Sequence, residues 1–333
     1  MLLTDDPISD DGEDWLGFNA HATSLMEKID SMEGPLTTGV YGCWGCGKSS
    51  FLELIGRLLE SKEKGGNWGG DEKEKQGIFV KFNAWQYERE EHPIVPLIGT
   101  IVNGIENSGI CSKKLKKLCD TLKMVASGVS CKISSELPWI GKTSLTISPA
   151  KMIRYREELR SQAIASKSEY FQFYESLQEA VKNLPVKFFV LVDDLDRCTP
   201  EKAFGLLEGI KLVLSQEQFF FFLAVNREIV EEYLTNRFRK EYGLRKFFME
   251  GYLDKIVQLS TYVEKLLPQA DFTKYTKNQI DAINAIDDSI KEKLRLFKKY
   301  LKEEDKIDLI NRACSNNPRT IKRFINSLIL QHF

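Results

Sequence analysis

The chain has 333 residues, of which 42% are hydrophobic and 29% charged. This length fits two units, or one large α/β unit with an appendage, and the composition excludes a disordered chain. The 47 basic residues balance 48 acidic ones, which excludes a globally basic nucleic-acid binder. No apolar run is long enough to span a membrane, the first residues lack the features of a secretory signal, and the seven cysteines fit reduced thiols. We therefore expect a cytoplasmic protein.

Short apolar strands alternate with longer helical segments along the chain. Thr199 followed by Pro200 predicts the start of a helix that runs to about residue 214. Apolar strands separated by helices are typical of a parallel sheet covered on both faces, so we expect an α/β fold. The predicted strands are residues 37–41, 78–82, 186–192, 219–225 and 256–259.

Two regions interrupt this alternation. Residues 92–185 contain no convincing core strand and carry a helical pattern near residues 151–184, so we interpret them as a mostly helical insertion on the sheet. The end of the chain is charged, helix-patterned and free of strands, which predicts a helical lid. The predicted core has two parts, residues 1–91 and 186–267, separated by the insertion at residues 92–185. The predicted lid is residues 268–333.

The strongest motif is GCWGCGKS at residues 42–49, which fits the phosphate-binding pattern G-x-x-x-x-G-K-[ST] between a predicted strand and a predicted helix. Its glycines let backbone N–H groups curl around an anion at the helix N-terminus. Lys48 is expected to reach the β- and γ-phosphates of ATP, and the Ser49 hydroxyl to ligate Mg²⁺. The residues predicted to bind the nucleotide are Gly42, Gly45, Cys46, Gly47, Lys48, Ser49 and Ser50, with Arg319 from the lid.

Two acidic residues follow the predicted strand at 186–192. At the carboxyl end of a parallel strand, Asp193 is placed to hold Mg²⁺ and Asp194 to polarise the attacking water. In the alternative interpretation, Asp194 and Asp196 cap the following helix. Because aspartate reaches less far than the commoner glutamate, we expect slow turnover.

The strand predicted at residues 219–225 ends in Asn226 and Arg227. Asn226 could position the γ-phosphate or the water, and Arg227 could sense that phosphate or stabilise transition-state charge. The alternative for Asn226 is helix capping. Arg197 and Arg319 are further candidates, and which arginine acts within its own chain or on a neighbouring subunit stays open.

Weaker signals allow other interpretations. Cys43 and Cys46 have C-x-x-C spacing beside a helix N-terminus and a lysine, which predicts lowered thiol pKa values and, as a hypothesis, oxidative inactivation rather than zinc binding. Trp44 and Trp85 could stack on a base, although core packing is favoured for Trp85. The basic run at residues 113–117 could meet nucleic acid, but no aromatic platform accompanies it.

These motifs together resemble the KAP family of P-loop NTPases. The resemblance covers essentially the whole chain and implies an ATP-binding domain with a central parallel sheet of order 5-1-4-3-2 and with residues 16–18 beside the adenine. It also implies a role in signalling or in defence against phage. Many relatives carry membrane spans between the two Walker elements, whereas here that stretch is too polar. The resemblance rests on residues 6–18, GVYGCWGCGKSSFL at 39–52, FNAW at 82–85, DDLDRC at 193–198, YLDKIVQL at 252–259 and NPRTIKRFIN at 317–326.

Three functions remain open from the sequence. The first is a Mg²⁺-dependent ATPase whose slow hydrolysis drives a conformational or oligomeric switch. The second is a non-hydrolysing, ATP-dependent scaffold that recruits a separate effector, such as a nuclease or a membrane protein. The third is an ATPase stimulated by nucleic acid. The expected partners are ATP and either further copies of the chain or a separately encoded effector protein.

Overall fold

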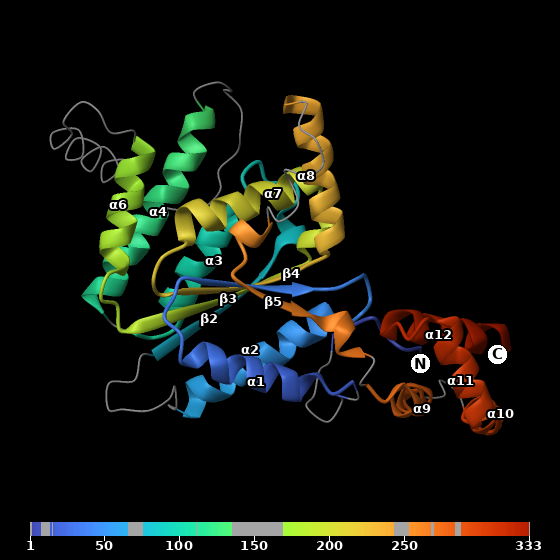
Figure 1. The fold of residues 1–333 in the computed structure, drawn as a ribbon. Coiled ribbons are helices and arrows are strands. Elements are labelled where there is room, and N and C mark those ends of the chain that lie inside the picture. The colour runs from blue at the N-terminus through green and yellow to red at the C-terminus, as the bar shows by residue number, and fades with distance from the viewer. Residues whose placement is uncertain are drawn as a thin grey trace.

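A five-stranded parallel sheet forms the centre of the protein (Figure 1). The computed structural model describes residues 2–7, 14, 16–65, 76–110, 112–134, 169–242, 253–267, 270–283 and 288–332. The spatial order β2-β3-β4-β1-β5 is the order implied by the family resemblance, so the α/β prediction is confirmed. The strands are β1 (Leu36–Tyr41), β2 (Gln76–Asn83), β3 (Val186–Asp193), β4 (Phe219–Val225) and β5 (Leu259–Tyr262).

The first four strands contain the predicted segments, but the fifth was predicted in the wrong place. Residues 256–259 were expected to form it, whereas β5 is Leu259–Tyr262. Ile256 and Val257 are buried, yet they lie in a turn in which both of their N–H groups donate to Leu253 O. The residues of β5 are only partly buried at the sheet edge, so the apolar pattern marked the turn instead of the strand.

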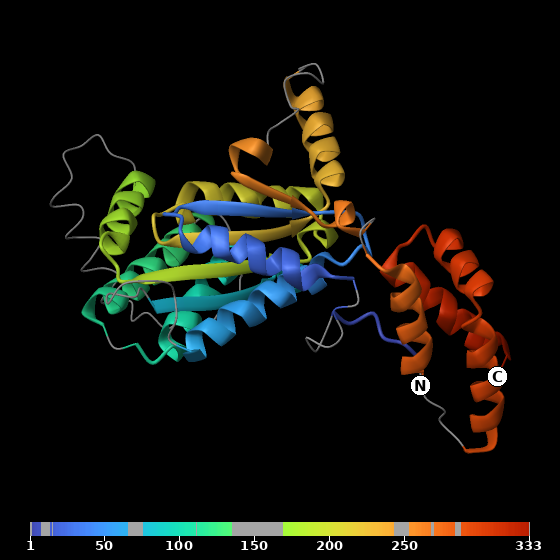
Figure 2. The same cartoon turned by 60° about the horizontal axis from the view of Figure 1, so that its bottom comes forward.

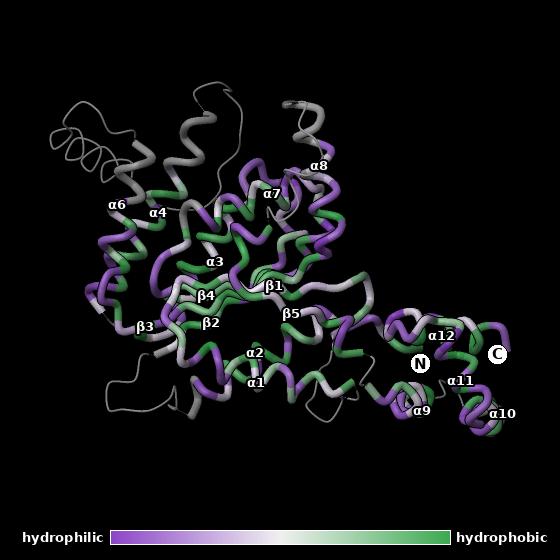
Figure 3. Tube along the Cα trace, viewed as in Figure 1, coloured by the Kyte–Doolittle hydropathy of each residue, from purple (hydrophilic) through white to green (hydrophobic). Residues whose placement is uncertain are grey.

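The sheet has two covered faces because successive strand residues point to opposite sides. On β3 and β4, Phe188 stacks on Phe219 on one face, with ring centroids 4.6 Å apart. On the other face Phe189 stacks on Phe220 at 5.2 Å. Figure 3 shows the resulting hydrophobic centre. Burial of each phenylalanine stabilises the fold by about 1.5–3 kcal/mol.

Helices cover both faces (Figure 1). α1 (Phe18–Asp30) and α2 (Lys48–Gly65) pack on one face. The helix predicted after Thr199 is confirmed, and its last turn, Ile210–Leu214, is π-helical. The other face carries α3 (Ile94–Asn107), α4 (Lys113–Ser134), α6 (Glu169–Val181), α7 (Pro200–Gly209) and α8 (Arg227–Tyr242).

The connection between β2 and β3 is helical where the structure describes it. α3 buries Leu97 and Ile101 against the sheet, as a crossover helix between parallel strands does. Residues 151–168, the first part of the predicted helix at 151–184, lie outside the described residues. Within the described part of the chain, no helix combines the length and the apolar character that crossing a membrane requires.

The last four helices form a bundle beyond one end of the sheet (Figure 2). The N-terminal segment lies beside α12, where Leu3 bonds to Asn326. Ile310 of α11 and Ile321 of α12 join the same apolar cluster as α1 and α2, so the bundle packs on the core. The four helices are α9 (Phe272–Ala282), α10 (Asp288–Leu301), α11 (Glu304–Ala313) and α12 (Pro318–His332).

Candidate functional site

The loop between β1 and α2 has the backbone that a phosphate-binding loop needs. Gly45 and Gly47 adopt positive φ angles of 80° and 106°, a region that side chains disfavour. A Cβ on Gly47 would lie 2.6 Å from Phe18 Cε2, and one on Gly45 would lie 2.7 Å from Arg319 Cβ. Both positions therefore require glycine, and the loop is held between α1 and α12.

Lys48 is the first residue of α2, and its side chain folds back over the loop. Its Nζ donates to Gly42 O at 2.9 Å and to Cys43 O at 3.1 Å. It also lies 2.9 Å from Asp196 Oδ2, in an ion pair whose side chains are only 8% and 5% exposed. The sequence predicted the lysine but not this partner, for which helix capping was the alternative. The buried charge of Lys48 is thus balanced within the protein.

Asp193, the last residue of β3, meets Ser49 of α2. Burial raises the pKa of the Asp193 carboxyl above its ordinary value, although a hydrogen bond from the Asp194 N–H and one with the Ser49 side chain act in the opposite direction. A cation would offset the cost of this burial, and a carboxylate beside a hydroxyl supplies the oxygen ligands that Mg²⁺ prefers. The predicted pair Ser49 and Asp193 therefore fits Mg²⁺.

Both carboxylate oxygens of Asp194 are engaged. Oδ2 accepts a 2.8 Å hydrogen bond from Asn83 Nδ2, and Oδ1 lies 2.7 Å from Arg197 Nε. The Asp194 backbone is left-handed, with φ 55°, which turns the chain between β3 and the short helix Leu195–Arg197. Asp194 precedes this helix without a side-chain capping bond, so the capping alternative is wrong for Asp194.

A single cavity of about 700 Å³ brings these residues together. The loop residues Gly45, Gly47, Lys48, Ser49 and Ser50 line it, with Asn83, Asp193, Asp194, Asp196 and Arg197 from the sheet edge, and with Arg319 from α12. Gly42 and Cys46 are not among the described lining residues: Gly42 acts through its carbonyl on Lys48, and Cys46 is buried behind the loop.

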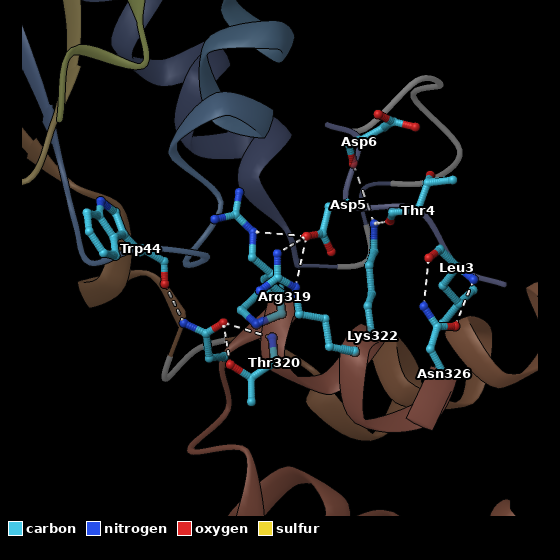
Figure 4. Close-up of polar contacts among 12 residues, drawn as sticks. Leu3, Thr4, Asp5, Asp6, Trp44, Arg319, Thr320, Lys322 and Asn326 are labelled. Atoms are coloured by element: carbon cyan, nitrogen blue, oxygen red, sulfur yellow. Dashed lines mark hydrogen bonds and ion pairs between the residues drawn. The ribbon is translucent and has the colours of Figure 1, made fainter. Parts of the chain in front are cut away.

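The N-terminal segment forms another wall of this cavity (Figure 4). Leu3 donates through its N–H to Asn326 Oδ1 and accepts through its carbonyl from Asn326 Nδ2, both at 2.8 Å. Asp5 Oδ2 accepts from Arg323 Nε at 2.9 Å and lies 3.8 Å from Arg319 Nε. Residues 2–7 are therefore fixed along α12.

A second contact joins α12 to the phosphate-binding loop. Asn317 Nδ2 donates to Trp44 O at 2.9 Å, and the Arg319 N–H donates to Gly45 O at 3.4 Å. Figure 4 shows Trp44 beside this end of the helix. Trp44 lines the cavity and is 59% exposed. The C-terminal bundle therefore contacts the loop directly.

Asn226 and Arg227, at the start of α8, are held by contacts within the protein. Asn226 Oδ1 accepts from the backbone N–H groups of Glu228 and Ile229, so Asn226 caps α8. Arg227 donates to Glu231 and Asp254, at 2.7 and 3.0 Å, and to the Tyr262 hydroxyl. Neither residue is among the described lining residues of the cavity, and their catalytic roles stay predictions.

Two interpretations of side chains were wrong. Burial raises the pKa of Cys46 to about 12, so the low-pKa thiol expected at this position is absent. The helix terminus and Lys48 do not outweigh the loss of water around the sulfur. Trp85, expected in the core, is 51% exposed, and the guanidinium of Arg197 lies 5.4 Å from the centre of its ring.

Asn83 and Asp196 are among the cavity residues that the sequence analysis did not assign to the site. Asn83 follows an apolar strand just as Asp193 does, and the two are register partners in β2 and β3. That position at a strand end is the signal that could have found Asn83. Asp196 lay in the acidic motif, but its ion pair with Lys48 depends on tertiary structure.

A phosphate-binding loop after β1, an acidic strand end on β3 and one strand between them define this protein as a P-loop NTPase domain. The comparison with known families agrees. The chain belongs to the KAP family, whose P-loop domain matches residues 18–332. It is also 26% identical over 271 residues to the phage T7 exclusion protein of Escherichia coli (strain K12), a match that covers 77% of this chain and 34% of the relative. The chain thus spans about a third of that relative's length. Family membership indicates nucleotide binding.

Proposed function

We propose that this domain binds Mg²⁺–ATP and hydrolyses it slowly, and that the bound nucleotide controls the contact between the core and the C-terminal bundle. The observation that carries the proposal is the shared cavity. It unites the loop around Lys48, the acidic end of β3 and the first turn of α12.

The binding chemistry follows from the residues on the loop. Backbone N–H groups and the Nζ of Lys48 would hold the β- and γ-phosphates, with Lys48 exchanging its carbonyl partners for phosphate oxygens. Ser49 and Asp193 would hold Mg²⁺, which supplies charge neutralisation at the phosphates when bound. Arg319, whose guanidinium faces the cavity beside Asp5, would add a cation from the bundle.

Asp194 is the proposed base that orients the attacking water. General base catalysis contributes about 10²–10⁴-fold to a rate, so its loss would be measurable. Because Asn83 and Arg197 each engage one carboxylate oxygen, they fix the orientation of the Asp194 side chain. An aspartate reaches less far than a glutamate, which supports slow turnover.

Release of phosphate from Mg²⁺–ATP, measured with the wild type, Asp194→Ala and Lys48→Ala, tests the proposal. We expect Asp194→Ala to lose turnover while its ATP affinity stays within about threefold, and Lys48→Ala to lose affinity. No turnover in the wild type, with binding retained, would favour the alternative of a non-hydrolysing scaffold. Unchanged affinity in Lys48→Ala would overturn the site itself.

We propose a biological role in phage exclusion, supported by the name of the Escherichia coli relative. Expression of the chain in a sensitive strain, followed by plating of a phage panel, tests this role. Lower plating efficiency that requires Lys48 would support it. Equal protection by wild type and Lys48→Ala would separate any exclusion from nucleotide binding.

Further copies of the chain or a separate effector protein are the proposed recipients of the nucleotide signal. The direct contact of α12 with the loop at Gly45 and Trp44 supports this role. A phosphate bound to the loop would change the position of the C-terminal bundle relative to the core. Sedimentation of the protein with and without Mg²⁺–ATP tests assembly. A mass that is independent of nucleotide would leave a separate effector as the recipient.

A further inference from the structure

Three residues on one face of α9 line the nucleotide cavity. Tyr275, Gln279 and Ala282 are spaced four and three residues apart, so they lie along a single stripe of the helix. This stripe faces the cavity from the bundle, while the phosphate-binding loop faces it from the core. The two sides differ in chemistry: Lys48 supplies charge at the loop, whereas the stripe carries no charged side chain.

Gln279 is the unusual member of the stripe. Its side chain is buried, with 5% of the residue exposed. The other buried polar groups on α9 have partners: Tyr275 donates its hydroxyl to Pro318 O, and Thr276 donates to Asn311 Oδ1. Within the described residues, Gln279 has no side-chain hydrogen bond, and it borders the cavity.

Among the described residues, Gln279 is not one of the fully enclosed polar side chains that lack a partner, so its amide reaches the open space of the cavity. An amide that opens only onto the cavity can hydrogen-bond with a ligand there. A primary amide presents one donor and one acceptor side by side, which matches the edge of a purine base. Phosphate oxygens only accept, so they would leave the amide oxygen unpaired.

From these observations we propose that Gln279 recognises the edge of the nucleotide's base and so contributes to base selection at this site. The inference rests on the proposed function, because it needs a nucleotide whose phosphates sit on the loop. The remaining stripe residues would contact the base through apolar surface, Tyr275 through its ring and Ala282 through its methyl group.

The variant Gln279→Leu removes the amide while keeping a similar volume. We measure dissociation constants for ATP and for purine riboside triphosphate, which has the same ring, sugar and phosphates but lacks the 6-amino group. The wild type should prefer ATP by about three- to tenfold, the effect of one hydrogen bond. In Gln279→Leu that preference should shrink to about twofold or less.

Two further measurements keep the test independent of folding. The melting temperature of nucleotide-free Gln279→Leu should stay close to that of the wild type, because the variant loses no protein hydrogen bond. Gln218→Ala is the control, since Gln218 is also a buried glutamine but lies just before β4, outside the described lining of the cavity. It should retain the preference for ATP.

The outcomes separate the two proposals. If the wild type binds neither nucleotide, the proposed function fails. If both bind and Gln279→Leu keeps the wild-type preference, the assignment of Gln279 is overturned while the nucleotide site stands. GTP is the third ligand: an equal loss of GTP affinity in Gln279→Leu would support recognition of purines in general, because an amide can rotate to match guanine.

Discussion

The side-chain amide of Asn83 donates to Asp194 Oδ2 over 2.8 Å, which joins the end of β2 to the residue that follows β3. The bond is possible because Asn83 and Asp193 are register partners in adjacent parallel strands. Asn83 thereby fixes the orientation of the proposed base without providing acid–base chemistry of its own.

Asn83→Ala should therefore lower kcat for ATP hydrolysis by about tenfold and change KM by less than about twofold, because it acts through Asp194. A double-mutant cycle distinguishes this positioning role from an independent one. The double variant with Asp194→Ala should be no slower than Asp194→Ala alone. Additive losses in kcat would show that Asn83 contributes separately.

The buried ion pair between Lys48 and Asp196 predicts an effect on stability. Asp196→Asn leaves the Lys48 charge buried with only carbonyl partners, so the free energy of unfolding of the nucleotide-free protein should fall by about 1–3 kcal/mol. Urea denaturation measures this change. Asp5→Asn is the control, because its ion pair with Arg323 is exposed and should contribute little. An equal fall in the free energy of unfolding in both variants would contradict the claim that burial makes the Lys48–Asp196 pair the more important one.

The raised pKa of Asp193 predicts two effects of pH, one on the stability of the folded protein and one on Mg²⁺ binding. Because the folded pKa lies above the unfolded one, the folded protein takes up protons more readily, and its stability falls as pH rises through the interval between the two values. Asp193→Asn removes this penalty, so near neutral pH the nucleotide-free variant should melt at a higher temperature than the wild type.

Binding of Mg²⁺ should respond in the other direction. The carboxylate must be ionised to hold the cation, so Mg²⁺-dependent ATP affinity should decline on acidification at a higher pH than for an ordinary aspartate. Titration of ATP binding against pH, with and without Mg²⁺, measures this. A decline that is identical in the two series would contradict a metal role for Asp193.

Cys46 should resist alkylation. With its pKa raised to about 12, the thiol stays protonated near neutral pH, and the thiolate is the reactive form. Iodoacetamide at about pH 8 should label the exposed Cys43 well before Cys46, as read by fragmentation of the peptide that carries both. Similar labelling rates at the two sulfurs would revive the hypothesis of oxidative inactivation.

The parts of the molecule that could be predicted are those whose pattern lies within one short stretch of sequence. β3 and β4 were found because continuous apolar residues are needed where both faces of a sheet are covered. β5 was predicted in the wrong place because its residues, only partly buried at the sheet edge, lack a continuous apolar pattern. Lys48 and Ser49 were found because a phosphate-binding loop is contiguous in sequence.

The site residues that could not be predicted depend on contacts between distant segments. Asp196 and Gln279 differ from other polar residues only in what the folded chain brings beside them, an ion-pair partner for one and a cavity wall for the other. Arg227 was predicted to face phosphate because it follows a strand of the sheet. In the folded protein Glu231, four residues further along α8, and Asp254 engage it, and the contact with Asp254 has no local signal.

The bond between Leu3 and Asn326 also sets an order on the assembly of the protein. The two residues are 323 positions apart, so Leu3 can meet its partner only after the whole intervening stretch has been synthesised. Contacts of such long sequence separation form late, because closing the intervening chain costs entropy. The wall contributed by residues 2–7 should therefore close late, and nucleotide binding that depends on this wall would require residues 3–326 to be folded together.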